Sequence, residues 1–339
     1  MSLADWYKVE QLPWPTEWPT LFGRPAPLRV EIGFGNGLFL IRLAQTHPAD
    51  NVLGIEISLP ALRHAVRKVE RAGLDNVRLL QGDAAAALHA LCRPGYVAAV
   101  TINFPDPWPK KDHLGRRLID DTFLHLLATR LPAGGALDIA TDHDDYAEQI
   151  TACLLRSPHF ASRLDAPFVL TDPERVTTKY ESVALAEGRT PRYYHWRRND
   201  APAEDVFPVP QELPMPHVVL RGPADLDEIG RRFRPGVVEI GATRIRTIEA
   251  YRSLRDGKLL IETYIGEEPI WQRLGLEIRA RRSGELVVAL AEVGFPRPTR
   301  GAHLAIHYIV EWLRAEFPAI VIVHSTLQVN HVDVTHERD

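Results

Sequence analysis

Apolar and polar positions along the first two thirds of the chain predict strands that alternate with helices. Short apolar runs bounded by turn residues predict buried strands at 28–32, 51–57, 76–80, 96–102 and 135–140. Segments with the helical spacing of apolar positions predict helices at 37–46, 59–72, 118–131 and 144–156. Strands and helices that alternate at this spacing form a parallel sheet covered on both faces. A doubly wound α/β fold with a mostly parallel sheet is therefore predicted.

The pattern changes after a proline-rich segment. Residues 201–216 contain five prolines and are predicted to form a semi-rigid linker. Consecutive strands then follow at 217–221, 236–249, 257–265, 273–281 and 285–293, with a helix at 301–316 and a last strand at 320–323. This order predicts a smaller α+β domain over 217–339, after a first domain at 26–200. Residues 1–25, rich in Trp and Pro, are predicted to be an irregular arm that packs on the core or becomes ordered on binding.

Composition restricts the class of protein. The 339 residues are enough for two domains, and the formal net charge of -4 does not indicate a nucleic-acid binder unless basic residues gather locally. The two cysteines, Cys92 and Cys153, lack metal-ligand spacing, which is typical of reduced thiols in a cytoplasmic protein. No apolar run reaches the ~18 residues of a membrane helix. Nothing in the sequence implies a membrane or a protein partner.

A glycine-rich turn follows the first strand. Gly33, Gly35 and Gly37 allow the backbone to bend sharply and to approach a ligand closely. A dinucleotide fingerprint would have a glycine where this chain has Leu38, and Glu31 would repel a pyrophosphate. A carboxylate instead suits a ligand with a positive centre, such as a sulfonium or an amino group. The turn therefore favours S-adenosylmethionine over NAD, with a purely structural turn as the alternative.

Two further acids follow the next two strands. Glu56 ends the second strand, where a carboxylate can bind both hydroxyls of a ribose. Asp83 follows the third strand, where it would contact an adenine edge or, equally well, cap the next helix. Together with Glu31 they would line the carboxyl ends of the parallel strands, where open α/β sheets bind ligands.

The most informative segment is Asn-Phe-Pro-Asp-Pro-Trp-Pro-Lys-Lys at 103–111, after the fourth strand. Its three prolines remove backbone donors and fix φ, so the segment is predicted to be a stiff loop. Such a loop would hold the carboxylate of Asp106 in a fixed position, as chemistry at a site requires. Trp108 would stack on a base or pack within the loop. Of these two, packing is favoured, because a Trp between prolines is usually packed.

These motifs, in the order EIGFGNG, IE, GD, NFPDPWPKK, TD and TKYE, closely resemble the bacterial tRNA (guanine-N7)-methyltransferases, the TrmB family, from about Trp18 to Arg198. The resemblance implies a Rossmann-like class I methyltransferase domain, S-adenosylmethionine as co-substrate, tRNA as partner, no metal, and methylation of a variable-loop guanosine. It implies cofactor contacts from Glu31, Gly33, Gly35, Gly37, Glu56, Asp83 and Asp106. It also implies substrate contacts from Lys110, Asp142, Thr178, Lys179, Tyr180 and Glu181.

The chemistry of the reaction suggests the role of Asp106. Guanine N7 carries an in-plane lone pair and no proton, so its attack on a methyl group needs no general base. Positive charge leaves sulfur and develops on the purine during the transfer. A fixed carboxylate can orient the base through its N–H groups and stabilise that charge. Asp106 is therefore predicted to act by orientation and electrostatics rather than by proton abstraction.

Contacts to tRNA phosphates would come from basic side chains near these motifs. The candidates are Lys110, Lys111, Arg116, Arg117, Arg189, Arg192, Arg197 and Arg198, which would otherwise form an ordinary solvated surface. The segment 111–115 is less basic than the family pattern. We therefore hypothesise that the last domain adds contacts. Its candidates are Arg231, Arg232, Arg234, Arg279, Arg281 and Arg282.

Other interpretations are weaker. His303 and His307 share a helix, but no acid or cysteine completes a zinc ligand set. The pair Thr141 and Asp142 would, without the resemblance, be read as a helix cap, and His143 as a helix-start residue. A methyltransferase for a small molecule or protein, or a tRNA-binding protein with a silent site, are the alternative functions. The 103–111 segment argues against the first, and the complete set of acids argues against the second.

Overall fold

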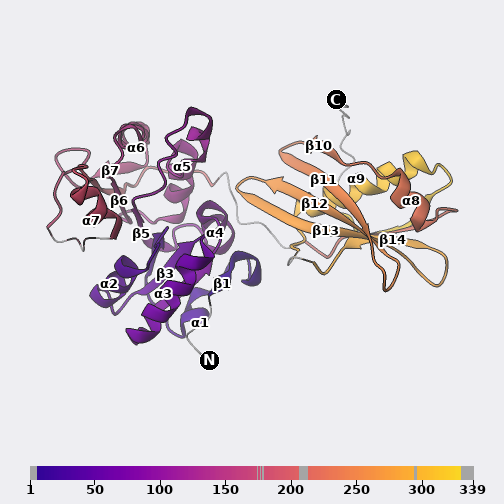
Figure 1. Cartoon of the computed structure of the whole chain (residues 1–339), viewed down its shortest axis with the longest axis horizontal. Coiled ribbons are helices and arrows are strands. Elements are labelled where there is room, and N and C mark those ends of the chain that lie inside the picture. The colour runs from indigo at the N-terminus through magenta and orange to yellow at the C-terminus, as the bar shows by residue number, and fades with distance from the viewer. Residues whose placement is uncertain are drawn as a thin grey trace. The chain divides into compact units, whose positions relative to one another are not determined.

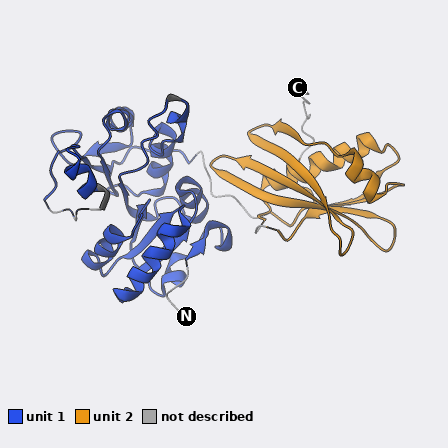
Figure 2. Cartoon of the chain, viewed as in Figure 1, with its two compact units in different colours: residues 1–209 blue, residues 210–339 orange. Residues whose placement is uncertain are grey.

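The computed structural model describes residues 6–173, 175, 177, 179–205, 213–293 and 296–329, without the side chains of Lys111, Lys179 and Tyr180. The chain divides into two compact units, Met1–Val209 and Pro210–Asp339 (Figures 1 and 2). The unit boundary falls inside the proline-rich segment at 201–216, of which 206–212 lies outside the described residues. Each unit has its own sheet and is described separately.

The first unit contains an eight-stranded sheet in the order β1-β4-β3-β2-β5-β6-β8-β7. Its strands are β1 (Tyr7–Lys8), β2 (Leu28–Ile32), β3 (Asn51–Glu56), β4 (Val77–Gln81), β5 (Val97–Asn103), β6 (Ala136–Thr141), β7 (Phe160–Ser162) and β8 (Arg192–Arg198). Strands β1 to β6 pair in parallel, and β8 is antiparallel to both β6 and β7. The strand order reverses between β2 and β5, where open α/β sheets bind ligands.

Helices lie between the strands of this sheet along the chain. They include α2 (Leu38–Thr46), α3 (Leu59–Arg71), α4 (Ala84–Leu91), α5 (Asp121–Arg130), α6 (Asp144–Arg156) and α7 (Lys179–Ala186). Helices α2 to α5 connect the parallel strands, α6 follows β6, and α7 lies between the antiparallel strands β7 and β8. Helix α3 begins where Ser58 Oγ accepts a hydrogen bond from the Ala61 amide at 3.4 Å, which satisfies one free donor of the first turn. Its buried side chains, Leu62, Ala65 and Val69, follow the helical period and pack with α2 against β3 and β4.

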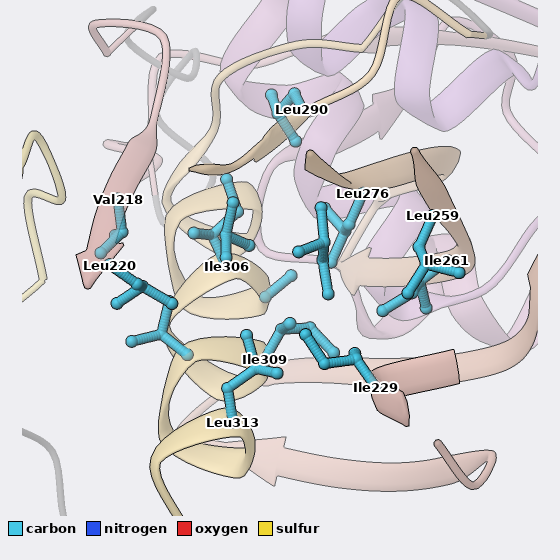
Figure 3. Close-up of a cluster of buried hydrophobic side chains, with 14 of the residues drawn as sticks. Val218, Leu220, Ile229, Leu259, Ile261, Leu276, Leu290, Ile306, Ile309 and Leu313 are labelled. Carbon is cyan, nitrogen blue, oxygen red and sulfur yellow. The ribbon is translucent and has the colours of Figure 1, made fainter. Parts of the chain in front are cut away.

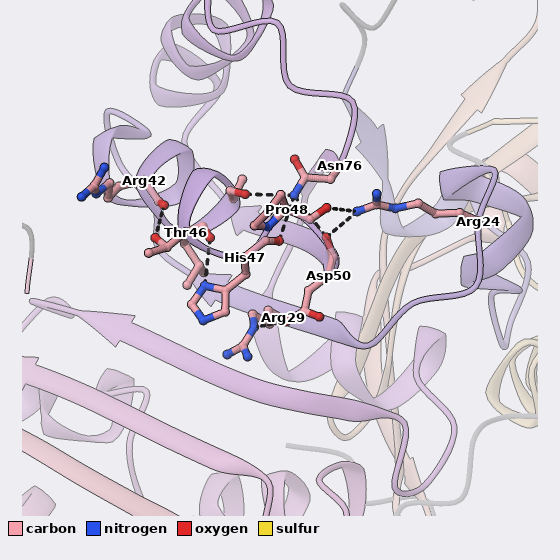
Figure 4. Close-up of polar contacts among 10 residues, drawn as sticks. Arg24, Arg29, Arg42, Thr46, His47, Pro48, Asp50 and Asn76 are labelled. Carbon is pink, nitrogen blue, oxygen red and sulfur yellow. Dashed lines mark hydrogen bonds and ion pairs between the residues drawn. The ribbon is translucent and has the colours of Figure 1, made fainter.

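A polar network fixes the loop that precedes β3 (Figure 4). Asn76 Nδ2 donates to the carbonyl oxygens of Ala44, His47 and Asp50 at 3.1, 3.3 and 3.1 Å. Arg24 Nη2 donates to the Asp50 carbonyl at 2.7 Å. Because this loop lies at the amino end of β3, the network belongs to the edge of the sheet opposite the glycine turn. It stabilises the scaffold rather than the candidate site.

The N-terminal segment packs on the core. Strand β1 pairs in parallel with β4, followed by the 3-10 helix η1 (Val9–Gln11) and helix α1 (Trp18–Phe22). Trp18 is 1% exposed, and the indole of Trp14 donates to the Val9 carbonyl at 3.2 Å. For residues 6–25 the structure shows the packed alternative, but the segment is not the irregular arm that was predicted, because it contains β1, η1 and α1.

The second unit is a seven-stranded antiparallel sheet in the order β10-β11-β12-β13-β14-β9-β15. Its elements are β9 (His217–Arg221), α8 (Leu226–Arg232), β10 (Gly236–Ile240), β11 (Thr243–Arg252), β12 (Leu259–Glu267), β13 (Ile270–Ala280), β14 (Leu286–Leu290), α9 (Arg300–Glu316) and β15 (Val321–Ser325). Buried and exposed residues alternate along β11, β12 and most of β13, as expected for strands with one face on a core.

Helices α8 and α9 cover the inner face of this sheet (Figure 3). Ile306, Ile309 and Leu313 of α9 project toward Leu276 and Leu220 of the strands, and all five side chains are at most 1% exposed. Burying each of these five side chains stabilises the folded state by roughly 1.5–3 kcal/mol. The second unit therefore has a hydrophobic core of its own.

The predicted fold class is confirmed for both parts of the chain. The structure differs from the sequence prediction at 236–249, which is not one strand but the hairpin of β10 and β11. The break is at Gly241, whose φ of 61° turns the chain between two runs that share one alternating pattern. Helices α7 and α8 and strands β7 and β8 were not predicted from the periodicity.

Candidate active site

The glycine turn joins β2 to α2 with three left-handed residues. Gly33, Gly35 and Gly37 have φ values of 70°, 51° and 75°, which residues with a Cβ rarely adopt. The turn begins with the Gly33 amide bonded to the Ile55 carbonyl at 2.8 Å. A Cβ on Gly37 would lie 3.0 Å from the Cβ of Ala65 on α3, so this position also needs glycine for helix packing. The turn is fixed to the neighbouring strand and helix.

Glu56 is the last residue of β3, and its side chain forms a hydrogen bond with the glycine turn. One carboxylate oxygen accepts from the amides of Ile57 and Ser58, both at 2.9 Å, and the other accepts from the Gly35 amide at 3.0 Å. Three backbone donors therefore fix the direction of this carboxylate before any ligand binds. A positioned carboxylate at this strand end fits the predicted contact with ribose hydroxyls.

Glu31 is buried at the switch point, with 1% of the residue exposed. Its Oε1 accepts a hydrogen bond from Asn103 Nδ2 at 3.0 Å. Its Oε2 is buried and has no hydrogen-bond partner among the described residues. Burial raises the pKa of this carboxyl to about 8, against the smaller lowering effects of Asn103 and Arg175. A buried, unpartnered carboxylate oxygen beside the glycine turn fits a cationic ligand group and opposes a pyrophosphate.

A chain of polar contacts leads away from Glu31. Arg175 donates to Asn103 Oδ1 and forms an ion pair with Glu181, Nε to Oε2 at 3.4 Å. Tyr193 donates to the other oxygen of Glu181 at 2.8 Å. The side chains of Arg175 and Glu181 are only 5% and 6% exposed. These polar contacts therefore connect the carboxyl end of β2, through β5, to the helix that carries the TKYE motif.

Asn103, Arg175 and Tyr193 are not among the site residues predicted from the sequence. Asn103 opens the proline-rich loop, so its position in the motif could have indicated it. Arg175 lies 72 residues further along, in a stretch without periodicity, and no pattern pointed to it. Its guanidinium also lies 4.9 Å from the ring centre of Phe39, a residue on α2. The site therefore depends on one long-range cation that only the structure shows.

The loop after β5 is strained and tightly held. Phe104 and Trp108 have φ values of 50° and 42°, which cost roughly 1–3 kcal/mol each for residues other than glycine. Arg117, only 7% exposed, donates to the Pro107 carbonyl at 2.7 Å and to Gln149 Oε1 at 2.8 Å. Such strain persists only where surrounding contacts over-determine the backbone. The structure thus agrees with the predicted stiffness of the loop.

The loop exposes two of the predicted site residues to solvent. Asp106 and Lys110 are exposed, and Asp106 is three residues from Asn103, which contacts Glu31. Trp108 is half-buried, with the ring of His113 at 5.6 Å and the Arg116 guanidinium at 5.1 Å from its ring centre. Of the two alternatives for Trp108, these contacts favour packing within the loop.

Asp83 caps helix α4 in this structure. Its Oδ1 accepts a hydrogen bond from the Ala86 amide at 2.9 Å, and its side chain is exposed at the end of β4. The capping alternative is therefore correct for one oxygen. Contact of Asp83 with an adenine edge stays a prediction.

The segment after β6 is held by ion pairs. Asp142 is paired with Arg189, and Asp144 with Arg192 at 2.7 Å. His143, not Asp142, occupies the N-cap position of α6, as expected for a helix-start residue. Asp142 is thus not the cap of that helix, and its predicted contact with substrate stays open.

The TKYE motif is described only in part. Thr178 lies outside the described residues, and Lys179 and Tyr180 are the first two positions of α7, with side chains that are not described. Glu181, which was predicted to contact the substrate, is turned inward to Arg175 and Tyr193. Substrate contact by Glu181 would require these bonds to be exchanged.

Two of the arginines predicted to contact phosphates are buried. Arg117 supports the proline-rich loop, and Arg198 is 7% exposed, with bonds to the carbonyls of Ala128 at 2.8 Å and Ala201 at 2.6 Å. A guanidinium bound to main-chain carbonyls inside the domain cannot also bind a phosphate at the surface. The prediction is therefore wrong for these two residues, while Arg116 and Arg197 are exposed.

The residues that the structure describes contain no cluster of three or more His, Cys, Asp or Glu side chains that would hold a metal. His303 is buried in α9, where Nε2 lies 3.1 Å from the Pro214 carbonyl and Nδ1 accepts from the Gln328 amide at 3.0 Å. Both ring nitrogens form hydrogen bonds with backbone groups. This histidine ties two segments of the second unit together.

Comparison with known proteins agrees with this geometry. A family model described as a putative methyltransferase matches residues 25–192. The tRNA (guanine-N(7)-)-methyltransferase of Thermus thermophilus is 34% identical over 322 residues, 92% of this chain and 97% of that protein. The chain belongs to the tRNA (guanine-N(7)-)-methyltransferase family. The relative from Deinococcus radiodurans is 32% identical over 86% of this chain and 90% of its own length.

For some relatives in the tRNA (guanine-N(7)-)-methyltransferase family, the sequence similarity extends into the second unit. The Thermus match covers too much of the chain to be confined to the first unit. The relative from Halorhodospira halophila is 44% identical over 170 residues, which is 50% of this chain and 73% of that protein. Among the described residues, no helix is long and apolar enough to cross a membrane.

Proposed function

We propose that this protein is a tRNA (guanine-N7)-methyltransferase that uses S-adenosylmethionine and modifies the variable-loop guanosine at position 46 of tRNA. The observation that carries the proposal is the buried, unpartnered oxygen of Glu31 beside the glycine turn. Through Asn103 it is joined to the loop that bears Asp106. A site for a cation and an exposed carboxylate would thus lie near each other, where the strand order reverses. Such an enzyme would act in the cytoplasm, where tRNA is available.

The residues fit the co-substrate in charge and donor type. Glu31 would bind the amino group of S-adenosylmethionine, because a cation supplies the partner that its Oε2 lacks. Glu56 would bind the ribose hydroxyls, and Gly33, Gly35 and Gly37 would let the backbone approach closely. Asp83 would bind near the adenine with the oxygen not used in the helix cap. When bound, the co-substrate supplies an electrophilic methyl group on a sulfonium.

Asp106 would orient the guanine by accepting hydrogen bonds from its N–H groups. Asp106 lies in a strained loop whose next residue, Pro107, accepts a hydrogen bond from Arg117, and this loop would keep the carboxylate in place during the transfer. As positive charge moves from sulfur to the purine, this carboxylate would stabilise it without taking up a proton. Lys110, Asp142 and the TKYE residues Thr178, Lys179, Tyr180 and Glu181 would contact the substrate.

A labelling experiment tests the proposal. The protein is given S-adenosylmethionine labelled in the methyl group and unmodified tRNA, and the digested RNA is analysed for methylated nucleosides. We expect label in 7-methylguanosine, and none in a transcript whose variable-loop guanosine is replaced. Label in another nucleoside would assign a different RNA specificity. Label in protein or in small molecules, with none in RNA, would support the alternative methyltransferase class.

A further inference from the structure

The second unit has a cationic and aromatic patch on the face of its sheet that α8 and α9 leave uncovered. Within a strand, residues two apart share a face, and the buried Ile245, Ile265 and Gln272 define the inner one. Their neighbours in sequence therefore point outward. We call this outward set the Trp271 face. It consists of Arg244 and Arg246 on β11, Tyr264 and Gly266 on β12, and Trp271 and Arg273 on β13.

The register places these residues in two rows across three strands. In one row Arg246 is paired with Tyr264, and Tyr264 with Arg273. In the next row Arg244 is paired with Gly266, and Gly266 with Trp271, while on its other side Arg244 is paired with Glu239 of β10. Directly opposed side chains lie roughly 4.5–5.5 Å apart at their Cβ atoms. The two rows lie two residues apart along each strand, which is roughly 6.5 Å, so one nucleotide chain could contact both.

Trp271 lies flat on Gly266. A Cβ built on Gly266 would be 2.5 Å from the six-membered ring of the indole, so the ring occupies the space that a side chain would take. Trp271 is nevertheless 55% exposed. One face of the indole is thus held against the sheet, while the other is open to solvent. A ring with one open face, held in place, suits stacking with a planar group.

Hydrogen bonds on the inner face of the sheet fix the strand that carries Trp271. Gln272 accepts from the Arg297 amide at 2.9 Å and donates to Thr299 Oγ1 at 3.0 Å. Glu267 at the end of β12 accepts from the Gly301 amide at 2.7 Å, at the N-terminus of α9. These bonds fix the start of β13 and the end of β12 to the helix. The position of the indole is therefore set before any partner binds.

The arginines of the face differ in how far they are neutralised. Arg246 forms no ion pair within the part of the chain that the structure describes, and Arg244 is 3.6 Å from Glu239. Arg273 is paired with Glu262 and lies 5.4 Å from the ring centre of Tyr264. Arg246 is thus the cation most available to a phosphate.

Three of the six arginines predicted from the sequence to contact tRNA in this unit are less suited to RNA. Arg232 is paired with Glu228 at 2.5 Å and Arg279 with Glu277 at 3.0 Å. Arg281 lies 3.7 Å from Glu285, within an i,i+4 pair. None of them adjoins an exposed aromatic ring on the same row. The structure therefore points to the Trp271 face instead.

We propose that the Trp271 face binds unpaired nucleotides of the tRNA substrate, with Trp271 stacking on one base and Arg244 and Arg246 contacting flanking phosphates. The inference rests on the proposed function for the identity of the RNA. Stacking on an aromatic ring combined with arginine contacts to the backbone is how proteins bind single-stranded RNA without reading its sequence. The face would add affinity without taking part in methyl transfer.

The test measures binding of fluorescently labelled tRNA to the full-length protein by anisotropy, at several salt concentrations. Arg246→Glu and Trp271→Ala are compared with Arg314→Glu, on α9, and Leu254→Ala, a fully exposed apolar residue between β11 and β12. We expect Trp271→Ala to weaken binding about 5- to 100-fold, as loss of one stacked base does. Arg246→Glu should reduce the salt dependence by about one phosphate contact, a change in slope of roughly 0.7–0.9. The controls should bind within twofold of the unchanged protein.

Trp271 also covers a glycine in the sheet, so its replacement would alter packing. Trp271→Phe keeps an aromatic ring there and should restore most of the binding. Unchanged tRNA affinity in Arg246→Glu, with weakened binding only where thermal unfolding shows lost stability, would overturn the proposal. Competition by polyglutamate as strong as by single-stranded RNA would also overturn it, in favour of an acidic protein partner.

The outcome separates this proposal from the proposed function. If the variants weaken tRNA binding but the unchanged protein forms no 7-methylguanosine, the Trp271 face stands and the proposed function fails. If 7-methylguanosine forms and Arg246→Glu and Trp271→Ala keep the KM for tRNA of the unchanged protein, the proposed function is supported and the proposal for the Trp271 face is wrong. If both proposals are correct, Arg246→Glu and Trp271→Ala should raise KM for tRNA and leave KM for S-adenosylmethionine unchanged, while the two controls leave both values unchanged.

Discussion

Replacing Glu31 by glutamine should stabilise the ligand-free protein at alkaline pH while it weakens cofactor binding. Burial raises the pKa of Glu31 from 4.5 to about 8 in the folded protein, and the unfolded chain restores the ordinary value. Between these two values the folded state holds a proton that the unfolded state has lost. The free energy of unfolding therefore falls as pH rises, by up to 1.36 kcal/mol per pH unit.

The size of the effect follows from these two pKa values. Below pH 4.5 Glu31 is protonated in both the folded and the unfolded state, so it does not lower the free energy of unfolding. Above about pH 8 it lowers that free energy by the full amount, about 5 kcal/mol. From about pH 6 to about pH 8.5 the unchanged protein should lose about 2.5 kcal/mol of stability through this group. Glu31→Gln keeps the shape and the bond from Asn103 but carries no charge, so it should not show this loss.

The assay is urea unfolding of both proteins without ligand, at about pH 6 and about pH 8.5. Hydrogen exchange of peptides from the first unit follows its transition separately from that of the second. Calorimetry then measures S-adenosylmethionine binding, which the variant should weaken about 10- to 150-fold, because a hydrogen bond to a charged group contributes roughly 1.5–3 kcal/mol. If both proteins lost stability equally between the two pH values, Glu31 would be ionised throughout and this reasoning would be refuted.

Three further predictions concern the same site. Asp106→Asn should lower kcat for tRNA methylation by about 100-fold or more, with cofactor Kd within threefold, measured by single-turnover kinetics and calorimetry; equal losses in both would reassign Asp106 to cofactor binding. Arg175→Gln should increase hydrogen exchange in α7 and weaken cofactor binding, since it breaks the link between Asn103 and Glu181; unchanged exchange would show that the link is dispensable. Gly37→Ala should lower the free energy of unfolding by about 1–2 kcal/mol, because its φ of 75° is strained for any residue with a Cβ; a stability equal to that of the unchanged protein would contradict this.

The sheet of the first unit could be predicted because its strands are short apolar runs separated by amphipathic helices. The glycine turn and the positions of Glu31 and Glu56 followed from the same pattern, since residues after parallel strands share one edge. The hairpin of β10 and β11 was missed because both strands have the same alternation and only a short turn at Gly241 separates them. The periodicity of apolar positions indicates which face of a strand is buried, but it does not show where the chain reverses direction.

Charged residues were the least predictable part of the site. Arg117 and Arg198 look like members of a basic surface, yet both are buried on main-chain carbonyls. Arg175 has no local signal, because its partner Asn103 is 72 residues away in sequence. The burial of an arginine depends on which carbonyl groups the fold leaves without donors. That information exists only once the chain has folded.

The contacts from Glu31 through Asn103 and Arg175 to Glu181 imply that two binding events are not independent. A ligand that neutralises Glu31 changes the field at Arg175, and a ligand that displaces Glu181 changes the field at Asn103. Free energy coupled in one direction must be coupled equally in the other. Cofactor and tRNA would then each adjust the affinity of the other, and the order in which they arrive would affect the rate but not the final occupancy.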